Sequence, residues 1–182
     1  MIAALHRALD EAATDPACRV LVLGAPGHIF CAGHDLKEMA HHRAGADMGR
    51  AFLTQLFSDC AAMMVALSRF PKPTIAMVDG IATAGGLQLA ASCDLRFVSD
   101  RATFCLPGIV KGGFCTTPSV GVSRAMSRTH LMELIYEGTP FDHMNRALGP
   151  GAGEAKVRAQ LGRFGFSRDR ALEKLKSVHG KV

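Results

Sequence analysis

Apolar positions along the first 106 residues alternate between helix-like and strand-like spacing. Residues 1–13 repeat apolar side chains every three or four positions, which predicts an amphipathic helix. Continuous runs such as "TIAMV" (74–78) are typical of buried strands. The alternation of strand and helix predicts an α/β fold of βαβ units around a largely parallel sheet. The predicted elements are helix 1–13, strand 18–24, loop 25–35, helix 47–69, strand 74–78, helix 84–93 and strands 94–99 and 102–106.

The pattern changes after Pro107. A glycine-rich loop follows, and residues 123–138 again have the spacing of a helix. The stretch "GPGAG" (149–153) interrupts any regular element. We therefore expect a core domain at residues 1–142, followed by a basic, helical tail at 143–182 that matches no motif known to us.

Composition narrows the class of protein. The chain has 182 residues with 48% hydrophobic content, enough for one domain, and no apolar run long enough to predict a membrane span. Its first residues lack the pattern of a secretory signal. Six scattered cysteines without a C-x-x-C pair predict reduced thiols in the cytoplasm, with the mitochondrial matrix as the alternative, and no metal site.

The net charge of +5 is concentrated in the tail. A basic tail is compatible with binding to nucleic acid or to a membrane surface. The sequence has one tyrosine, no tryptophan and no nucleic-acid motif, so we predict neither partner. A solvated basic helix, or a patch that meets an anionic ligand, is the preferred interpretation.

Two loops place main-chain N–H groups at the start of a helix. They are "CAGHD" (31–35) and "TAGGLQ" (83–88), each following a predicted strand. Helix N-termini carry unpaired donors and partial positive charge, so they favour an anion or a developing oxyanion. Each glycine could instead serve only a turn or tight packing. Two such loops at the carboxyl ends of parallel strands favour a ligand site, because open α/β sheets bind ligands there.

The residues that carry these loops resemble a known family. "HIFCAGHDLKEM" followed by "KPTIAMVDGIATAGGLQLAASCDLRFVSDRATFCLPG" is similar to the enoyl-CoA hydratase/isomerase (crotonase) family over about residues 2–140. The resemblance implies a ββα spiral core, coenzyme A thioester substrates, no further cofactor, and an oxyanion hole from the N–H groups of His34 and Gly85. The neighbouring residues would contact substrate, namely Ala32, Gly33, Asp35, Lys37, Gly86 and Phe114.

The same resemblance shows two substitutions at the positions of the water-activating glutamates of hydratases. These positions correspond to Gln88 and Gly108 in this chain. An amide cannot accept a proton at neutral pH and glycine has no side chain, so the standard acid and base are missing. The His34 imidazole is a candidate base, or it faces solvent or the CoA phosphates. For Lys37 two roles stay open: its side chain contacts the nucleotide end of CoA, or it is simply solvated.

Two regions depart from the family pattern. The β-hairpin expected before the first helix is absent, so the core is expected to be truncated at the N-terminus, and the sequence is atypical after about residue 142. The family would imply a homotrimer or hexamer, which the altered C-terminal part puts in doubt. The sequence therefore leaves three hypotheses: an acyl-CoA enzyme working through a thioester enolate, a non-catalytic CoA-binding or regulatory module, and a partial product without a folded function.

Overall fold

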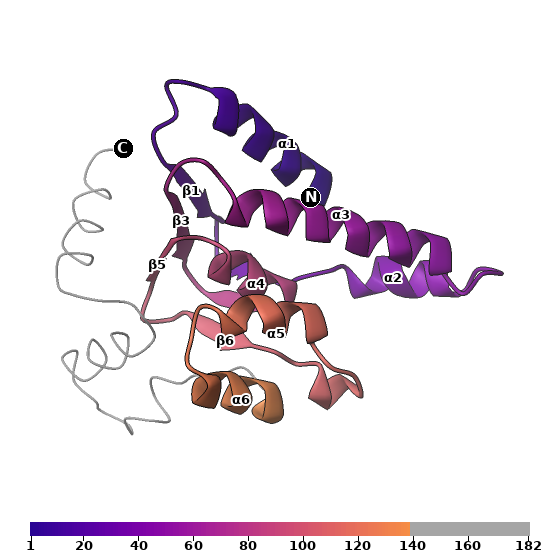
Figure 1. Cartoon of the computed structure of the whole chain (residues 1–182). Helices are drawn as coiled ribbons and strands as arrows, with labels where there is room; N and C mark the ends of the chain where they lie inside the picture. The colour runs from indigo at the N-terminus through magenta and orange to yellow at the C-terminus, as the bar shows by residue number, and fades with distance from the viewer. Residues whose placement is uncertain (139–182) are drawn as a thin grey trace.

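The computed structural model describes residues 1–138, so the predicted tail at 143–182 and the end of the predicted core lie outside the described residues (Figure 1). Helices and strands alternate along the described chain. The elements are α1 (Ile2–Thr14), β1 (Leu21–Gly24), β2 (Ile29–Cys31), α2 (Leu36–Arg43), α3 (Arg50–Ser68), β3 (Thr74–Val78), β4 (Ile81–Thr83), α4 (Gly85–Ala91), β5 (Leu95–Val98), β6 (Thr103–Cys105), the 3-10 helix η1 (Ile109–Lys111), α5 (Thr116–Ser123) and α6 (Arg128–Glu137).

The strands form two parallel sheets. The first has the order β1-β3-β5 and the second β2-β4-β6. Odd-numbered and even-numbered strands therefore belong to different sheets, and each consecutive pair contributes one strand to each sheet. Helices follow each pair, so the chain advances by repeated ββα units. This is the α/β spiral core that the family resemblance implies, and the fold class is confirmed.

The strands are parallel as predicted, but they form two sheets, and the apolar pattern shows neither β2 nor β4. Each of these two strands is only three residues long and lies where the sequence pattern predicts a loop or a turn. Strands this short do not show the alternation on which prediction depends. The predicted helix at 123–138 is also interrupted: α5 ends at Ser123, and α6 begins after Ser127, whose hydroxyl accepts a hydrogen bond from the His130 N–H.

Two hydrophobic clusters hold the fold together, and α4 contributes to both. The first cluster joins α1, α3 and the first sheet, and receives Leu89 from α4. The second joins α5 and α6, and receives Leu87 from α4. In Figure 1, α4 accordingly lies in the middle of the molecule, with α1 and α3 on one side and α5 and α6 on the other. The start of α4 is therefore fixed from two sides.

Helix α3 is the longest described helix, and it is strongly apolar. It is long and apolar enough to cross a membrane by length and composition alone, with a mean hydropathy of 1.4. Its last half supplies three buried residues to the first cluster, and it packs beside α1. A core helix passes the same test, so this observation alone is weak evidence for a membrane span.

Polar contacts tie the ends of distant elements together. Thr74, at the start of β3, donates from its N–H and its hydroxyl to Asp94, and the Asp94 N–H donates back to the hydroxyl, each at 2.8 Å. Asp94 therefore joins the end of α4 to the sheet. Lys72 donates to the carbonyls of Ala12 and Asp15, each at 2.6 Å, which places a cation at the carboxyl end of α1.

Candidate active site

The two predicted loops lie against each other. Gly33 follows β2 and Gly85 begins α4 directly after β4, and β2 and β4 are paired in parallel. A Cβ on Gly33 would be 3.2 Å from the Gly85 nitrogen and 3.3 Å from the Ala84 Cβ. Gly33 also has a φ of +86°, which side chains disfavour. The sequence "CAGHD" thus brings its backbone to the mouth of α4 because residue 33 is glycine.

The main-chain N–H groups of His34 and Gly85 donate to no acceptor among the described residues. Gly85 is the first residue of α4, where an N–H has no partner within its own helix. His34 lies between β2 and α2, outside any helix or strand. Both groups therefore lack an acceptor within residues 1–138, and the oxyanion hole that the family resemblance implies stays a prediction.

Backbone strain and close packing fix the entry to α4. Ala84 has a φ of 50°, a sparsely populated conformation that costs about 1–3 kcal/mol. Its N–H donates to the Cys105 carbonyl at 2.9 Å, and its own carbonyl accepts from the Gln88 N–H at 3.1 Å. A Cβ on Gly86 would be only 2.0 Å from the Cys31 carbonyl oxygen. Gly86 therefore serves helix-to-strand packing rather than a free face toward a ligand.

The last residue of the first loop, Asp35, is used as the cap of α2. Asp35 caps the helix, because its Oδ1 accepts from the N–H groups of Lys37 and Glu38 at 2.8 and 3.2 Å. Asp35 stands three residues before Glu38 in "DLKE", a spacing that predicts such a cap, and the structure confirms it. Ala32 and Lys37 are exposed beside the loop. Their predicted contacts with substrate stay predictions.

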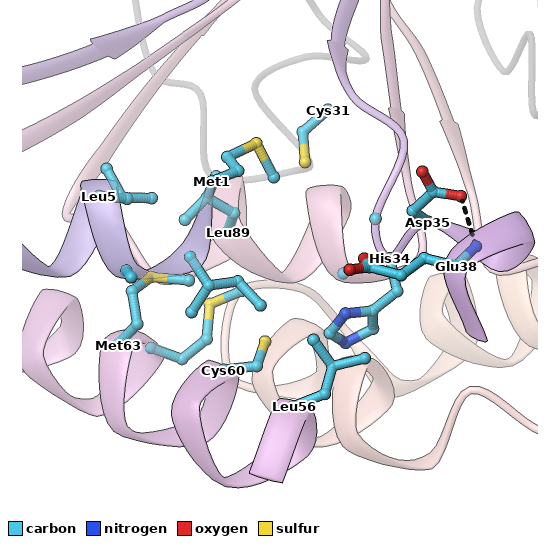
Figure 2. Close-up of a pocket in the computed structure, with 15 residues that line it drawn as sticks. Met1, Leu5, Cys31, His34, Asp35, Glu38, Leu56, Cys60, Met63 and Leu89 are labelled. Atoms are coloured by element: carbon cyan, nitrogen blue, oxygen red, sulfur yellow. Dashed lines mark hydrogen bonds between the residues drawn. The ribbon is translucent and has the colours of Figure 1, made fainter. Parts of the chain in front are cut away.

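A cavity of about 510 Å³ opens beside the two loops (Figure 2). Gly33, His34 and Gly85 form one part of its wall, and Asp35 and Glu38 add two carboxylates. The rest of the wall comes from α1, β2, α3 and α4 and is mainly apolar. These remaining lining residues are Met1, Ile2, Ala3, Leu5, Cys31, Leu56, Cys60, Met63, Met64 and Leu89. The cavity thus combines a polar end, where the donors lie, with an apolar interior.

The His34 side chain is half-buried at this polar end. Its ring meets the edge of the Phe57 ring, with centroids 5.3 Å apart and planes at 82°. Burial lowers the pKa of His34 below its ordinary value of 6.5, because the cationic form loses hydration. The ring is therefore neutral at pH 7 and able to accept a proton. Figure 2 shows it extending toward α3 and Leu56.

Gln88 is almost fully buried, with 9% of its surface exposed, and does not line the cavity. It faces α5, because a Cβ on Gly121 would be 2.9 Å from the Gln88 Cγ. The cavity contacts α4 through Gly85 and Leu89 instead. The structure therefore brings His34 and Gly85 together and leaves Gln88 on another flank of α4.

Gly108, the second position that corresponds to a family glutamate, has no room for a side chain. A Cβ on Gly108 would be 2.6 Å from the Cys115 nitrogen and 2.8 Å from the Phe114 carbonyl carbon. The loop before α5 therefore occupies the space that a side chain at 108 would need. Phe114 itself is 58% exposed and does not line the cavity.

Several cavity residues escaped sequence analysis. Leu56, Cys60 and Met63 come from α3, where helical apolar spacing predicts core residues, and the spacing of Glu38 to Asp35 predicts only a helix start. Spacing along α3 could not show which turn of its apolar face lines an open space. Within residues 1–138 no group of three or more His, Cys, Asp or Glu residues is arranged to hold a metal ion.

Known proteins are similar to this chain in sequence. A family model described as enoyl-CoA hydratase/isomerase matches residues 1–144. Enoyl-CoA hydratase domain-containing protein 3 of Xenopus laevis, named as mitochondrial, is 39% identical over 140 residues. That alignment covers 77% of this chain and 46% of the relative. The chain thus spans less than half the length of this relative.

Solved structures give the same picture. An enoyl-CoA hydratase/isomerase family protein from Silicibacter pomeroyi superimposes with a TM-score of 0.73 at 49% identity, over 93% of this chain and 74% of the other. Human enoyl-CoA hydratase domain-containing protein 3 superimposes with a TM-score of 0.70 at 32% identity, over 90% of this chain and 64% of the other.

Proposed function

Because the chain belongs to the enoyl-CoA hydratase/isomerase family, we propose that it binds acyl-CoA thioesters, with the acyl group in the cavity beside Gly33, His34 and Gly85. One observation carries this proposal. Two unpaired N–H donors from separate loops lie at the polar end of an otherwise largely apolar cavity. A thioester oxygen matches the donors, and an acyl chain matches the apolar wall.

The chemistry that follows from this arrangement is stabilisation of a thioester enolate. Both N–H groups are backbone atoms on fixed loops, so they need no reorganisation when negative charge develops on the oxygen. Losing one such donor typically costs about 2.7–4 kcal/mol of transition-state stabilisation. The proposal needs no metal and no cofactor besides the CoA of the substrate.

Titration calorimetry of the full chain with butanoyl-CoA tests the binding proposal. We expect saturable heat, and competition by free CoA if the nucleotide contributes. Absence of heat and of competition at millimolar ligand would refute it. A matched titration with butanoate alone separates recognition of the thioester from non-specific insertion of an acyl chain.

A second function is a non-catalytic CoA-binding or regulatory module. The observation in its favour is that neither glutamate position offers a carboxylate: Gln88 carries an amide, and backbone fills the space beside Gly108. Binding without any turnover of enoyl-CoA, and without exchange of the protons next to the thioester, would favour this function over an enzyme.

The compartment and the assembly follow from the relatives only as proposals. The Xenopus and human relatives are named as mitochondrial proteins. Their names agree with the mitochondrial matrix, our alternative, and give no support to the cytoplasmic prediction. We keep the homotrimer or hexamer as a prediction, which sedimentation velocity on the full chain tests directly.

A further inference from the structure

We propose that the His34 side chain is the proton-accepting catalytic group of this site. The inference rests on the proposed acyl-CoA binding and goes beyond it, because it assigns the base that an enolate requires. The two positions at which a carboxylate base would be expected hold a buried amide and a glycine packed against backbone.

The cavity wall limits the alternatives. Its titratable side chains are Cys31, His34, Asp35, Glu38 and Cys60. An ordinary thiol keeps its proton at neutral pH, and burial raises the pKa of the Cys60 thiol further. Asp35 is held by the two N–H groups that it caps. His34 and Glu38 remain as groups that can exchange protons inside the cavity.

His34 is favoured over Glu38 as the base. Its ring is half-buried and placed by the Phe57 ring, whereas Glu38 is exposed. A neutral imidazole can accept a proton at neutral pH, and its limited hydration means that it loses little solvation when it approaches a substrate. Figure 2 shows both side chains beside the same loop, at one end of the cavity. Glu38 is therefore the alternative proton acceptor at this end of the cavity.

The proton transfer balances without any further reactant. A ring nitrogen of His34 takes the proton from the carbon next to the thioester carbonyl. The electrons of the broken C–H bond form a carbon–carbon double bond, and the carbonyl pair moves to oxygen. The resulting enolate oxygen accepts from the N–H groups of His34 and Gly85. Return of a proton to the carbon restores the thioester, so the minimal observable reaction is exchange of that hydrogen with solvent.

The experiment measures deuterium uptake by butanoyl-CoA in deuterated buffer, by mass spectrometry, together with binding by calorimetry. His34→Gln keeps the backbone N–H but cannot accept a proton at neutral pH. We expect it to bind butanoyl-CoA like the wild type and to lose exchange by about 10²- to 10⁴-fold. Glu38→Gln should reduce exchange by a smaller factor. His41→Gln, an exposed histidine of α2 outside the cavity, should exchange like the wild type.

The possible failures are distinguishable. Wild-type protein that does not bind butanoyl-CoA overturns the proposed function and this inference with it. Wild-type protein that binds without exchange above the buffer rate leaves binding intact and overturns the inference alone. Exchange that survives in His34→Gln also overturns it, and exchange abolished only by Glu38→Gln transfers the role of base to Glu38.

Discussion

The Gly33 α-carbon faces the Gly85 nitrogen so closely that a methyl group on Gly33 would be 3.2 Å from that nitrogen. The first donor loop therefore reaches the second only because residue 33 has no side chain. The same contact brings both loops to the wall of one cavity. Substitutions at this contact test the site without touching any titratable group.

Gly33→Ala should weaken butanoyl-CoA binding by at least about tenfold, which corresponds to about 1.4 kcal/mol. The methyl group crowds the Gly85 nitrogen, and alanine also disfavours the left-handed backbone at φ +86°. Calorimetry measures the loss. Gly27→Ala is the matched control, because Gly27 has a similar φ of +82° and no atom within 4 Å of its added methyl group. Equal binding losses in both variants would mean that backbone strain, not crowding of the donor, is responsible.

Gly86→Ala should destabilise the fold by about 1–3 kcal/mol or more, the usual cost of overpacking. Its methyl group would be 2.0 Å from the Cys31 carbonyl oxygen, so α4 must move away from β2. Urea unfolding followed by circular dichroism measures this change. Gly85→Ala is the comparison, since its methyl group meets nothing closer than the Gly33 α-carbon at 3.6 Å. We expect Gly85→Ala to unfold like the wild type; equal losses in the two variants would contradict this assignment of Gly86.

Glutamate at position 108 should not create a hydratase, although the family resemblance alone predicts that it restores one. A side chain there meets the backbone of Phe114 and Cys115 at 2.6–2.9 Å. We expect Gly108→Glu, alone or with Gln88→Glu, to lower the thermal midpoint and to hydrate crotonyl-CoA no faster than the wild type. Gly113→Ala, whose methyl group meets only the Gly108 carbonyl at 3.9 Å, is the control in the same loop. Hydration of crotonyl-CoA by the double variant would contradict this prediction, because it would mean that the loop moves to make room for the glutamate.

The sequence predicted the parts of the fold whose patterns are strong. The run "TIAMV" became β3 at the predicted residues, and the first helix was placed to within one residue at each end. Asp35 was predicted as a helix cap from its spacing to Glu38, and the structure confirms the cap. These features depend on local chemistry, which a sequence displays directly.

The remaining features depend on contacts between distant segments. β2 and β4 are three residues each, and they become strands only because parallel partners lie beside them. The cavity exists because α3 passes the donor loops, and apolar spacing cannot distinguish a buried turn of that helix from one that lines a cavity. The filling of the space at Gly108 depends on backbone six and seven residues later, which no side-chain pattern reveals.

Asp94→Ala should cost about 1–3 kcal/mol of unfolding free energy, because it leaves a buried donor without its acceptor. The Asp94 carboxylate accepts from both the N–H and the hydroxyl of Thr74, which is 1% exposed. Asp94→Asn keeps one acceptor oxygen and should cost less. Urea unfolding of both variants, with the exposed Asp100→Ala as control, measures the difference. If Asp94→Ala and Asp100→Ala unfold alike, the contact with Thr74 contributes nothing to stability.

The stability of the wild type should fall as the pH drops below 6.5, and His34 should account for part of that fall. Burial lowers the pKa of His34 in the folded state below its ordinary value of 6.5. Above that pH the ring is neutral in both states. Below it the unfolded chain takes up a proton that the folded chain does not, so unfolding becomes easier until the lowered folded pKa is also passed.

Urea unfolding at about pH 7.5 and about pH 5.5 tests this linkage. His34→Gln removes the titrating ring and keeps the backbone, so its unfolding free energy should fall less between these two pH values than that of the wild type. Asp35, Glu38, Cys31 and Cys60 line the same cavity and are unchanged in the comparison. His41→Gln, which removes an exposed histidine from α2, should keep the wild-type dependence. The same fall in His34→Gln as in the wild type would contradict a buried, neutral imidazole, and with it the main physical reason for choosing His34 as the base.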